Sequence, residues 1–147
     1  MNLSVIAMAI TTIVVGIGIA LQIAVNTALA RRIGTLEATL VSVTVTWLFV
    51  AILLLPGLRR GGLGQLLSVP PYLLIGGFVG AAVLITAITF VPRLGTGGLI
   101  AAFLVGQLVG SLLLDHFGAF GLRHIPITPG RLAGAALLLV GMRLIIR

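Results

Sequence analysis

The chain of 147 residues contains no cysteine, no lysine and only two carboxylates, Glu37 and Asp115. The absence of cysteine excludes disulfides and thiolate metal sites, and it carries no information about the redox compartment. Two carboxylates this far apart in the sequence do not form an acid/base pair, and His116 and His124 come without a positioned nucleophile. No glycine-rich phosphate loop is present. The sequence therefore predicts a protein that is not an enzyme and that binds no cofactor or metal.

Charge of either sign is also scarce. Only 7% of the residues are charged, against roughly 25% in soluble domains, while 60% are hydrophobic. A soluble domain of this length could not bury so much apolar surface, so the sequence predicts an integral membrane protein whose main partner is the lipid bilayer. The nine arginines give a net charge of +7 and stand singly or in pairs between apolar runs. This pattern favours anchoring to lipid phosphates over binding to nucleic acid.

The apolar runs are long enough, or nearly so, to cross a bilayer, which requires roughly 17 to 25 helical residues. The breaks between them contain glycine or proline together with arginine, as expected where helices end at the membrane interface. The sequence predicts an all-α polytopic membrane protein with a single transmembrane domain over residues 1–147. Five transmembrane helices are expected, near residues 3–30, 37–55, 71–91, 97–115 and 130–146.

A short segment of the sequence occurs twice. The residues RIGT at 32–35 return as RLGT at 93–96, an offset of 61 residues, and Gly16, Ala20 and Leu53 match Gly77, Ala81 and Leu114 at the same offset. Both copies lie in the turn of an expected helical hairpin. A duplicated hairpin and a chance similarity in a chain rich in glycine, leucine and alanine are both compatible with this pattern.

The arginines are almost evenly divided between the two membrane sides that five helices would define. One side receives Arg59, Arg60, Arg123 and Arg131, and the other receives Arg31, Arg32, Arg93, Arg143 and Arg147. The difference in the number of Lys and Arg residues between the loops on the two sides sets the orientation of a membrane protein. Since these arginines are nearly balanced, the sequence hardly favours one orientation of the chain in the membrane. Either another feature fixes the orientation, or both orientations are made and an antiparallel pair of chains is the working unit. Such a pair would correspond to the two inverted repeats from which many transporters are built.

Polar side chains recur at helical spacing inside the apolar runs. Gln22 and Asn26 share one helix face, and Gln107, Ser111 and Asp115 share another. An amide in hydrocarbon requires a partner or a water-filled cavity, so these groups either join helices or line a substrate cavity. The candidate lining consists of Gln22, Asn26, Ser42, Thr46, Trp47, Gln107 and Ser111. Trp47 lies inside its run, where it is either core packing or a cavity wall.

Glu37 and Asp115 are candidates for ion coupling, because carboxylates in membranes often mark proton or cation pathways. Both lie near a boundary of the expected spans. The alternative for Glu37 is a place in the first turn of its helix, where the helix dipole favours an anion, and the alternative for Asp115 is a pair with Arg123 or His116. With no ionisable residue at mid-membrane, a neutral or zwitterionic substrate fits better than a bare ion.

Glycines at helical spacing allow close approach of helix backbones, the principal packing device in lipid. They are either contacts within the chain or candidates for a protomer interface. The interface candidates are Gly106, Gly110, Gly130, Gly134 and Gly141.

The chain resembles the YdcZ-type inner-membrane exporter family of the bacterial drug/metabolite transporter superfamily over nearly its whole length. The resemblance rests on Gln22, Asn26, Leu29, Gly34-Thr35, Ser42, residues 92–95, 106–108, 111–112 and 115–118, and Gly121, of which DHFG at 115–118 is the most specific. Where the family usually shows Phe and a nearby Gly after the serine, this chain has Val43 and Thr46. The resemblance implies a five-helix half of a ten-helix carrier in the bacterial inner membrane.

We therefore expect a transporter that exports a small polar or amphipathic metabolite by alternating access, with an antiparallel homodimer as the working unit. Two alternatives follow from the same features. A small dual-topology ion channel would have the same size and charge balance. A non-transporting subunit would require an oppositely oriented paralogue, so that the working unit would be a heterodimer.

Overall fold

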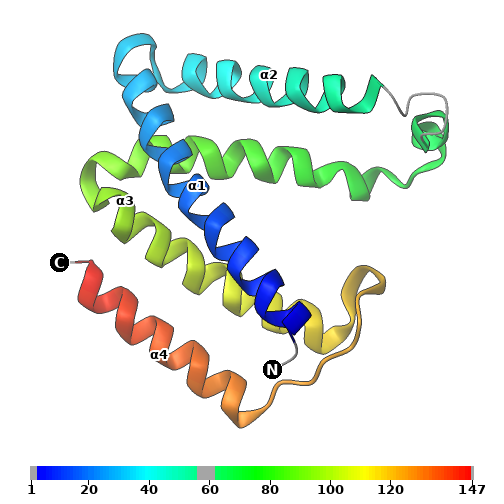
Figure 1. Cartoon of the computed structure of the whole chain (residues 1–147), viewed down its shortest axis with the longest axis vertical. Coiled ribbons are helices and arrows are strands. Elements are labelled where there is room, and N and C mark those ends of the chain that lie inside the picture. The colour runs from blue at the N-terminus through cyan, green and yellow to red at the C-terminus, as the bar shows by residue number, and fades with distance from the viewer. Residues whose placement is uncertain (1–2, 56–61, 147) are drawn as a thin grey trace. The chain divides into compact units, whose positions relative to one another are not determined.

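The computed structural model describes residues 3–55 and 62–146, and within these ranges the chain is helical and contains no strand (Figure 1). The α-helices are α1 (Leu3–Ile33), α2 (Thr35–Leu54), α3 (Ile75–Phe117) and α4 (Pro129–Ile145). Three 3-10 helices are η2 (Gly62–Ser68), η3 (Pro71–Leu74) and η4 (Ala119–Gly121). Arg59, Arg60 and Arg147, which entered the charge count, lie outside the described residues.

A single glycine makes the turn between α1 and α2. Gly34 has φ 99° and ψ 158°, a conformation that side chains with a Cβ rarely adopt. Its N–H donates to the Ala30 carbonyl at 2.9 Å, and its carbonyl accepts from the Ala38 N–H at 3.0 Å, so hydrogen bonds continue on both sides of the turn. Arg31 and Arg32 lie in the last turn of α1, where the helix dipole favours cations. The two helices therefore form a hairpin with a one-residue connection.

The α3 helix is interrupted near its middle. Gly95 has φ 69° and ψ 161°, which is not helical, and Pro92 lies three residues earlier. Proline has no N–H to donate to the carbonyl four residues before it, so the backbone ladder is already weakened when the chain reaches Gly95. The 43 residues of α3 therefore form two helices that meet at a kink.

Three segments of the described chain are long and apolar enough to cross a membrane, where five were expected. They are Val5–Ile33, Thr35–Leu54 and Pro71–Phe117. The third spans 47 residues and contains both segments expected near 71–91 and 97–115, because the kink at Gly95 does not end the helix. The helix expected near 130–146 is α4, which has only 17 residues and carries Arg131 and Arg143. The difference in number thus arises at the kink and at this short last helix.

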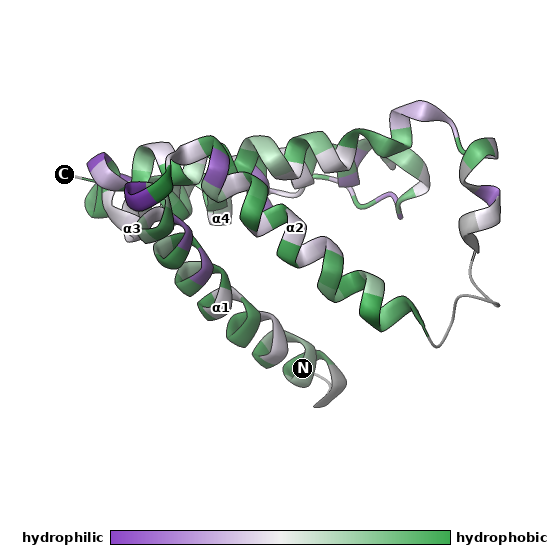
Figure 2. Cartoon of the chain, turned by 90° about the horizontal axis from the view of Figure 1, so that it is seen from above, coloured by the Kyte–Doolittle hydropathy of each residue, from purple (hydrophilic) through white to green (hydrophobic). Residues whose placement is uncertain are grey.

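The chain divides into two compact units, residues 1–92 and residues 93–147. In the first unit Ile23, Asn26 and Ala38 are buried near the α1–α2 turn, and in the second Leu99 and Leu112 are buried. Most of the large apolar side chains are exposed instead, and green, hydrophobic residues run along α1 and α2 in Figure 2. An apolar surface of this extent is the surface of a protein whose solvent is lipid.

Candidate transport site

Among the candidate lining residues, Asn26 makes a side-chain hydrogen bond to a side chain of another helix. Its side chain is only 7% exposed, and its Nδ2 donates to Ser42 Oγ at 3.2 Å. Asn26 belongs to α1 and Ser42 to α2, so this bond joins the two arms of the hairpin. Inside a low-dielectric layer such a bond satisfies two groups that would otherwise be unpaired. The structure thus gives Asn26 a helix-joining contact.

Hydroxyl groups in the long helices bond to their own backbone. Thr46 Oγ1 donates to the Ser42 carbonyl at 2.9 Å, and Ser111 Oγ donates to the Leu108 carbonyl at 2.9 Å. The buried Thr27 and Thr39 make the same local bond to the carbonyl four residues earlier, at 2.8 Å in each case. This contact satisfies the hydroxyl hydrogen without a second helix. Thr46 and Ser111 can therefore still accept a hydrogen bond from a ligand, but their own protons are engaged.

The two glutamine amides differ from Asn26. Gln22 on α1 and Gln107 on α3 are both exposed, and neither side chain makes a hydrogen bond within residues 3–55 and 62–146. Gln22 lies in the first compact unit and Gln107 in the second. Their convergence on one cavity stays a prediction. Each remains a donor and acceptor on a mostly apolar helix.

Trp47 is 66% exposed on α2, next to the exposed Thr46. Core packing within the chain is therefore not its role in the described structure. An indole at this depth has an apolar body and a single N–H donor. It is available to a ligand, to lipid or to another protomer.

Asp115 forms an ion pair with Arg131. The sequence predicted Arg123 or His116, not Arg131, as its partner. Arg131 Nη2 donates to Asp115 Oδ2, and Arg131 Nη1 donates to the Ile125 carbonyl at 3.2 Å. The Asp115 carbonyl accepts from the Ile125 N–H at 2.9 Å, so one residue holds the loop before α4 through both its side chain and its main chain. The expected partners Arg123 and His116 do not form this ion pair. The two side chains are about a quarter to a third exposed, so the pair is only partly shielded from water.

His116 lies in the last turn of α3, and His124 lies in the loop that follows this helix. The Ile127 N–H donates to His116 Nδ1 at 3.4 Å, and the His116 and His124 rings lie 5.9 Å apart between centroids. No group of three metal-ligating side chains occurs among the residues that the structure describes. The histidines here connect loop to helix.

Glu37 is exposed in the first turn of α2, and its carboxylate occupies the space that a Cβ at Gly34 would fill. An anion at this place interacts favourably with the helix N-terminus. Of the two carboxylates, Glu37 is the one without an ion pair in the described part of the chain. It therefore stabilises the hairpin turn locally, and a part in coupling stays a prediction.

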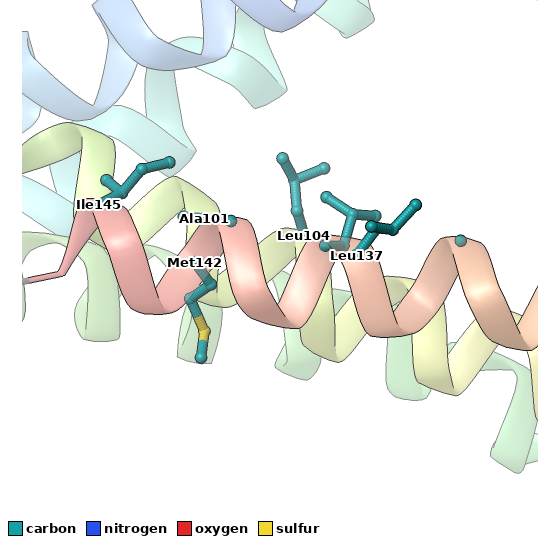
Figure 3. A pocket seen from close by; sticks show the side chains of 8 residues that line it. Ala101, Leu104, Leu137, Met142 and Ile145 are labelled. Atoms are coloured by element: carbon teal, nitrogen blue, oxygen red, sulfur yellow. The ribbon is translucent and has the colours of Figure 1, made fainter.

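A groove of about 340 Å³ lies within the second unit, between α3 and α4. Its lining is apolar and consists of Ala101, Leu104, Gly134, Leu137, Leu138, Gly141, Met142 and Ile145. In Figure 3 the side chains of Leu104 and Leu137 point to the same side of the two helices. Two of the predicted packing glycines line this groove, and none of the predicted polar lining residues does.

The glycines differ in what surrounds them. A Cβ at Gly98 would lie 3.3 Å from Ile146 Cγ1, and one at Gly97 would lie 3.9 Å from Ile145 Cγ2. These two glycines let the start of the second half of α3 approach the end of α4. They are adjacent rather than four residues apart, so helical spacing did not identify them as packing glycines. No atom lies within 4 Å of a Cβ built at the predicted interface glycines, which are Gly106, Gly110, Gly130, Gly134 and Gly141. Their place in a protomer interface stays a prediction.

Long apolar helices, polar groups held within them and an apolar surface define a multi-pass membrane protein, and the class this pattern fits best is that of membrane transporters. The family described as "Putative inner membrane exporter, YdcZ" matches residues 7–144, and the chain belongs to this family. Inner membrane protein YdcZ of Escherichia coli (strain K12) is 32% identical over 142 residues, which cover 92% of this chain and 91% of that protein. No solved structure matches the chain. The chain is an inner membrane protein, and its family is one of transporters rather than enzymes.

Proposed function

We propose that the chain is half of a carrier that exports a small polar or amphipathic metabolite by alternating access, and that two copies in opposite orientations form the working unit. The observation that carries this proposal is the pair of unpartnered amides, Gln22 and Gln107, on apolar helices. An unpaired amide in hydrocarbon costs several kcal/mol. In the membrane both must face a cavity or a partner, and a carrier supplies the cavity.

The lengths of the helices support five crossings. At 1.5 Å per residue the 43 residues of α3 extend about 65 Å, roughly twice the 30 Å of a hydrocarbon core, and Gly95 breaks the helix near the middle. The 17 residues of α4 extend about 26 Å, at the lower limit of a crossing. In this proposal α3 crosses twice and α4 once. The two termini then lie on opposite sides of the membrane.

The near balance of arginines supports an antiparallel pair, since neither orientation is favoured by the loops. Rocking of two oppositely oriented halves about a site near the midplane is the usual means of alternating access in carriers with inverted repeats. The amides Gln22 and Gln107 from both copies would face that site. Thr46, Ser111 and Trp47 would complete its wall.

The charges favour a substrate without a net charge. Asp115 is already paired with Arg131, and Glu37 lies in the first turn of α2 rather than in the middle of this helix. The groups that remain for a ligand are amide donors and acceptors, hydroxyl oxygens and an indole. These suit a neutral or zwitterionic molecule.

Because the substrate is not identified, the proposal is tested with proteoliposomes that contain many candidate compounds at once. The vesicles are loaded with a mixture of amino acids, nucleosides and sugars, and the loss of each compound is followed by mass spectrometry. We expect protein-dependent, saturable loss of one class of compound, and we expect Gln107→Leu to reduce it at least tenfold. Gln65→Leu, at an exposed position of η2, is the matched control and should leave the loss unchanged.

Three outcomes contradict the proposal or one of its parts. Flux that rises linearly with concentration at rates above those of carriers identifies a channel. Flux that appears only after a paralogous chain is added identifies a subunit of a heterodimer. Undiminished flux in Gln107→Leu removes this amide from the site.

A further inference from the structure

Two turns of the chain share both their sequence and their backbone conformation. Gly34 in RIGT at 32–35 has φ 99° and ψ 158°, and Gly95 in RLGT at 93–96 has φ 69° and ψ 161°. Positive φ with ψ near 160° is a rare combination that glycine alone adopts readily. Its recurrence in the same four-residue context supports a duplicated hairpin over a chance similarity.

The burial pattern repeats at the same offset. Asn26 and Thr27 before the first turn are buried, and so are Ala87 and Ile88 at the matching positions before the second. After the turns, Ala38 is fully buried and its counterpart Leu99 is 2% exposed. The residues at these matching positions, before and after the turn, are therefore buried in both copies.

The two copies differ in what joins their arms. In the first, Asn26 on one arm donates to Ser42 on the other. The positions that correspond at the offset of 61 are Ala87 and Phe103, whose side chains cannot form a hydrogen bond. The polar bond of the first hairpin has no equivalent in the second.

The second copy also has a weaker backbone at its turn. Pro92 stands where the first copy has Arg31, and the missing N–H leaves the backbone ladder one bond short directly before the non-helical Gly95. The division of the chain into two compact units falls between Pro92 and Arg93, at this same place. Proline is a common cause of a sharp kink in a helix.

From these observations we infer that residues 92–95 form a hinge in α3, about which residues 93–147 move, while the α1–α2 hairpin moves as one rigid body closed by Asn26 and Ser42. The use of this hinge in transport rests on the proposed function, whereas the hinge itself does not. Hinges in moving proteins are a few residues at the ends of elements that absorb changes of φ and ψ.

The absence of cysteine allows a direct test by spin labelling, because introduced cysteines are the only labelling sites. One pair of labels at Val14→Cys and Leu53→Cys spans the first turn, and the pair at Ile75→Cys and Leu114→Cys spans the second at the same offset of 61. All four positions are exposed. Labelled chain is reconstituted in lipid nanodiscs with an excess of unlabelled chain, so that distances within one chain dominate the pulsed dipolar signal.

We expect one narrow distance distribution across the first turn and a distribution at least twice as wide, or with two maxima, across the second. Pro92→Ala restores the missing N–H and should narrow the second distribution while leaving the first unchanged. Asn26→Leu should widen the first and leave the second unchanged.

Equal widths across the two turns in the unsubstituted chain overturn the hinge, and this comparison requires no further variant to fold. A second distribution that is wide but insensitive to Pro92→Ala, in a variant that keeps its helix content, also overturns it. A moving hinge in a chain that shows no flux leaves the hinge standing and removes the carrier, so the two proposals fail separately.

Discussion

At the scale of single residues, the polar groups of this exporter-family protein fall into those already satisfied and those that await a partner. Asn26 is satisfied by Ser42, and Asp115 by Arg131. Gln22 and Gln107 make no such contact in the described part of the chain. The satisfied groups should affect stability when changed, and the unsatisfied groups should affect transport.

The Asn26–Ser42 bond is expected to contribute a measurable coupling energy. In a double-mutant cycle, Asn26→Leu and Ser42→Ala should each destabilise the protein, and their coupling should be about 0.6 to 2 kcal/mol, the range of hydrogen bonds between membrane helices. Reversible unfolding in mixed detergent micelles measures it. A coupling energy near zero would show that the two groups do not depend on each other.

The Asp115–Arg131 pair is expected to fix the loop that precedes α4. Arg131→Gln leaves a partly buried carboxylate without its cation and should lower the free energy of unfolding by about 1 to 3 kcal/mol, between the effects seen for exposed and for buried pairs. Thermal unfolding in detergent checks this. Arg123→Gln, on the exposed part of the same loop, is the control and should change stability by less than about 0.5 kcal/mol.

At the scale of helices, the packing of α3 against α4 depends on Gly98. A Cβ at Gly98 would lie 3.3 Å from Ile146 Cγ1, a tight contact that leaves little room for a larger side chain, so Gly98→Leu should destabilise the protein by about 1 to 3 kcal/mol through overpacking. The control is Gly80→Leu, because a Cβ at Gly80 meets no atom within 4 Å and glycine is a poor helix former. A shift of the melting temperature downward for Gly98→Leu only is the expected result. Equal shifts for both would contradict the contact.

The helical class of the fold could be predicted from the sequence because lipid allows few alternatives. Apolar runs of this length can satisfy their backbone only as helices, and glycine, proline and arginine mark where the runs are interrupted. The number of separate spanning segments could not be predicted, since Pro92 and Gly95 kink α3 without ending it. Whether such a pair of residues bends a helix or ends it depends on packing at the bend.

The candidate site could be predicted only in part for a similar reason. Asn26 and Ser42 are both among the predicted lining residues, and the structure joins them by a hydrogen bond, whereas their part in lining a cavity stays a prediction. The partner of Asp115 could not be predicted, because the path of the loop over residues 118–128 decides which arginine returns to it. That path uses positive φ at Gly118, Phe120 and Gly121, which the sequence does not reveal at Phe120. The assembly of the remaining polar side chains into one cavity stays a prediction.

At the scale of the whole molecule, the five crossings that we propose divide the nine arginines almost evenly, which would make the orientation easy to shift. Reporters at the C-terminus should give signal on both sides of the membrane. The double substitution Arg31→Gln and Arg32→Gln leaves three arginines against four, which reverses the small excess, and should raise the share of molecules in the orientation that keeps the four in the cytoplasm. Signal confined to one side in the unsubstituted chain contradicts dual orientation.

The threonines that bond to the carbonyl four residues earlier bear on how the protein is made. Thr11, Thr12, Thr27, Thr39, Thr46 and Thr89 all form this bond. A hydroxyl engaged in this way requires nothing of later segments, so these threonines do not delay the entry of a newly made helix into the bilayer. Only the helices that carry amide side chains then require a second helix as a hydrogen-bond partner. Biogenesis would thus proceed by independent entry followed by pairing, with Asn26 setting the first pairing once Ser42 has emerged from the ribosome.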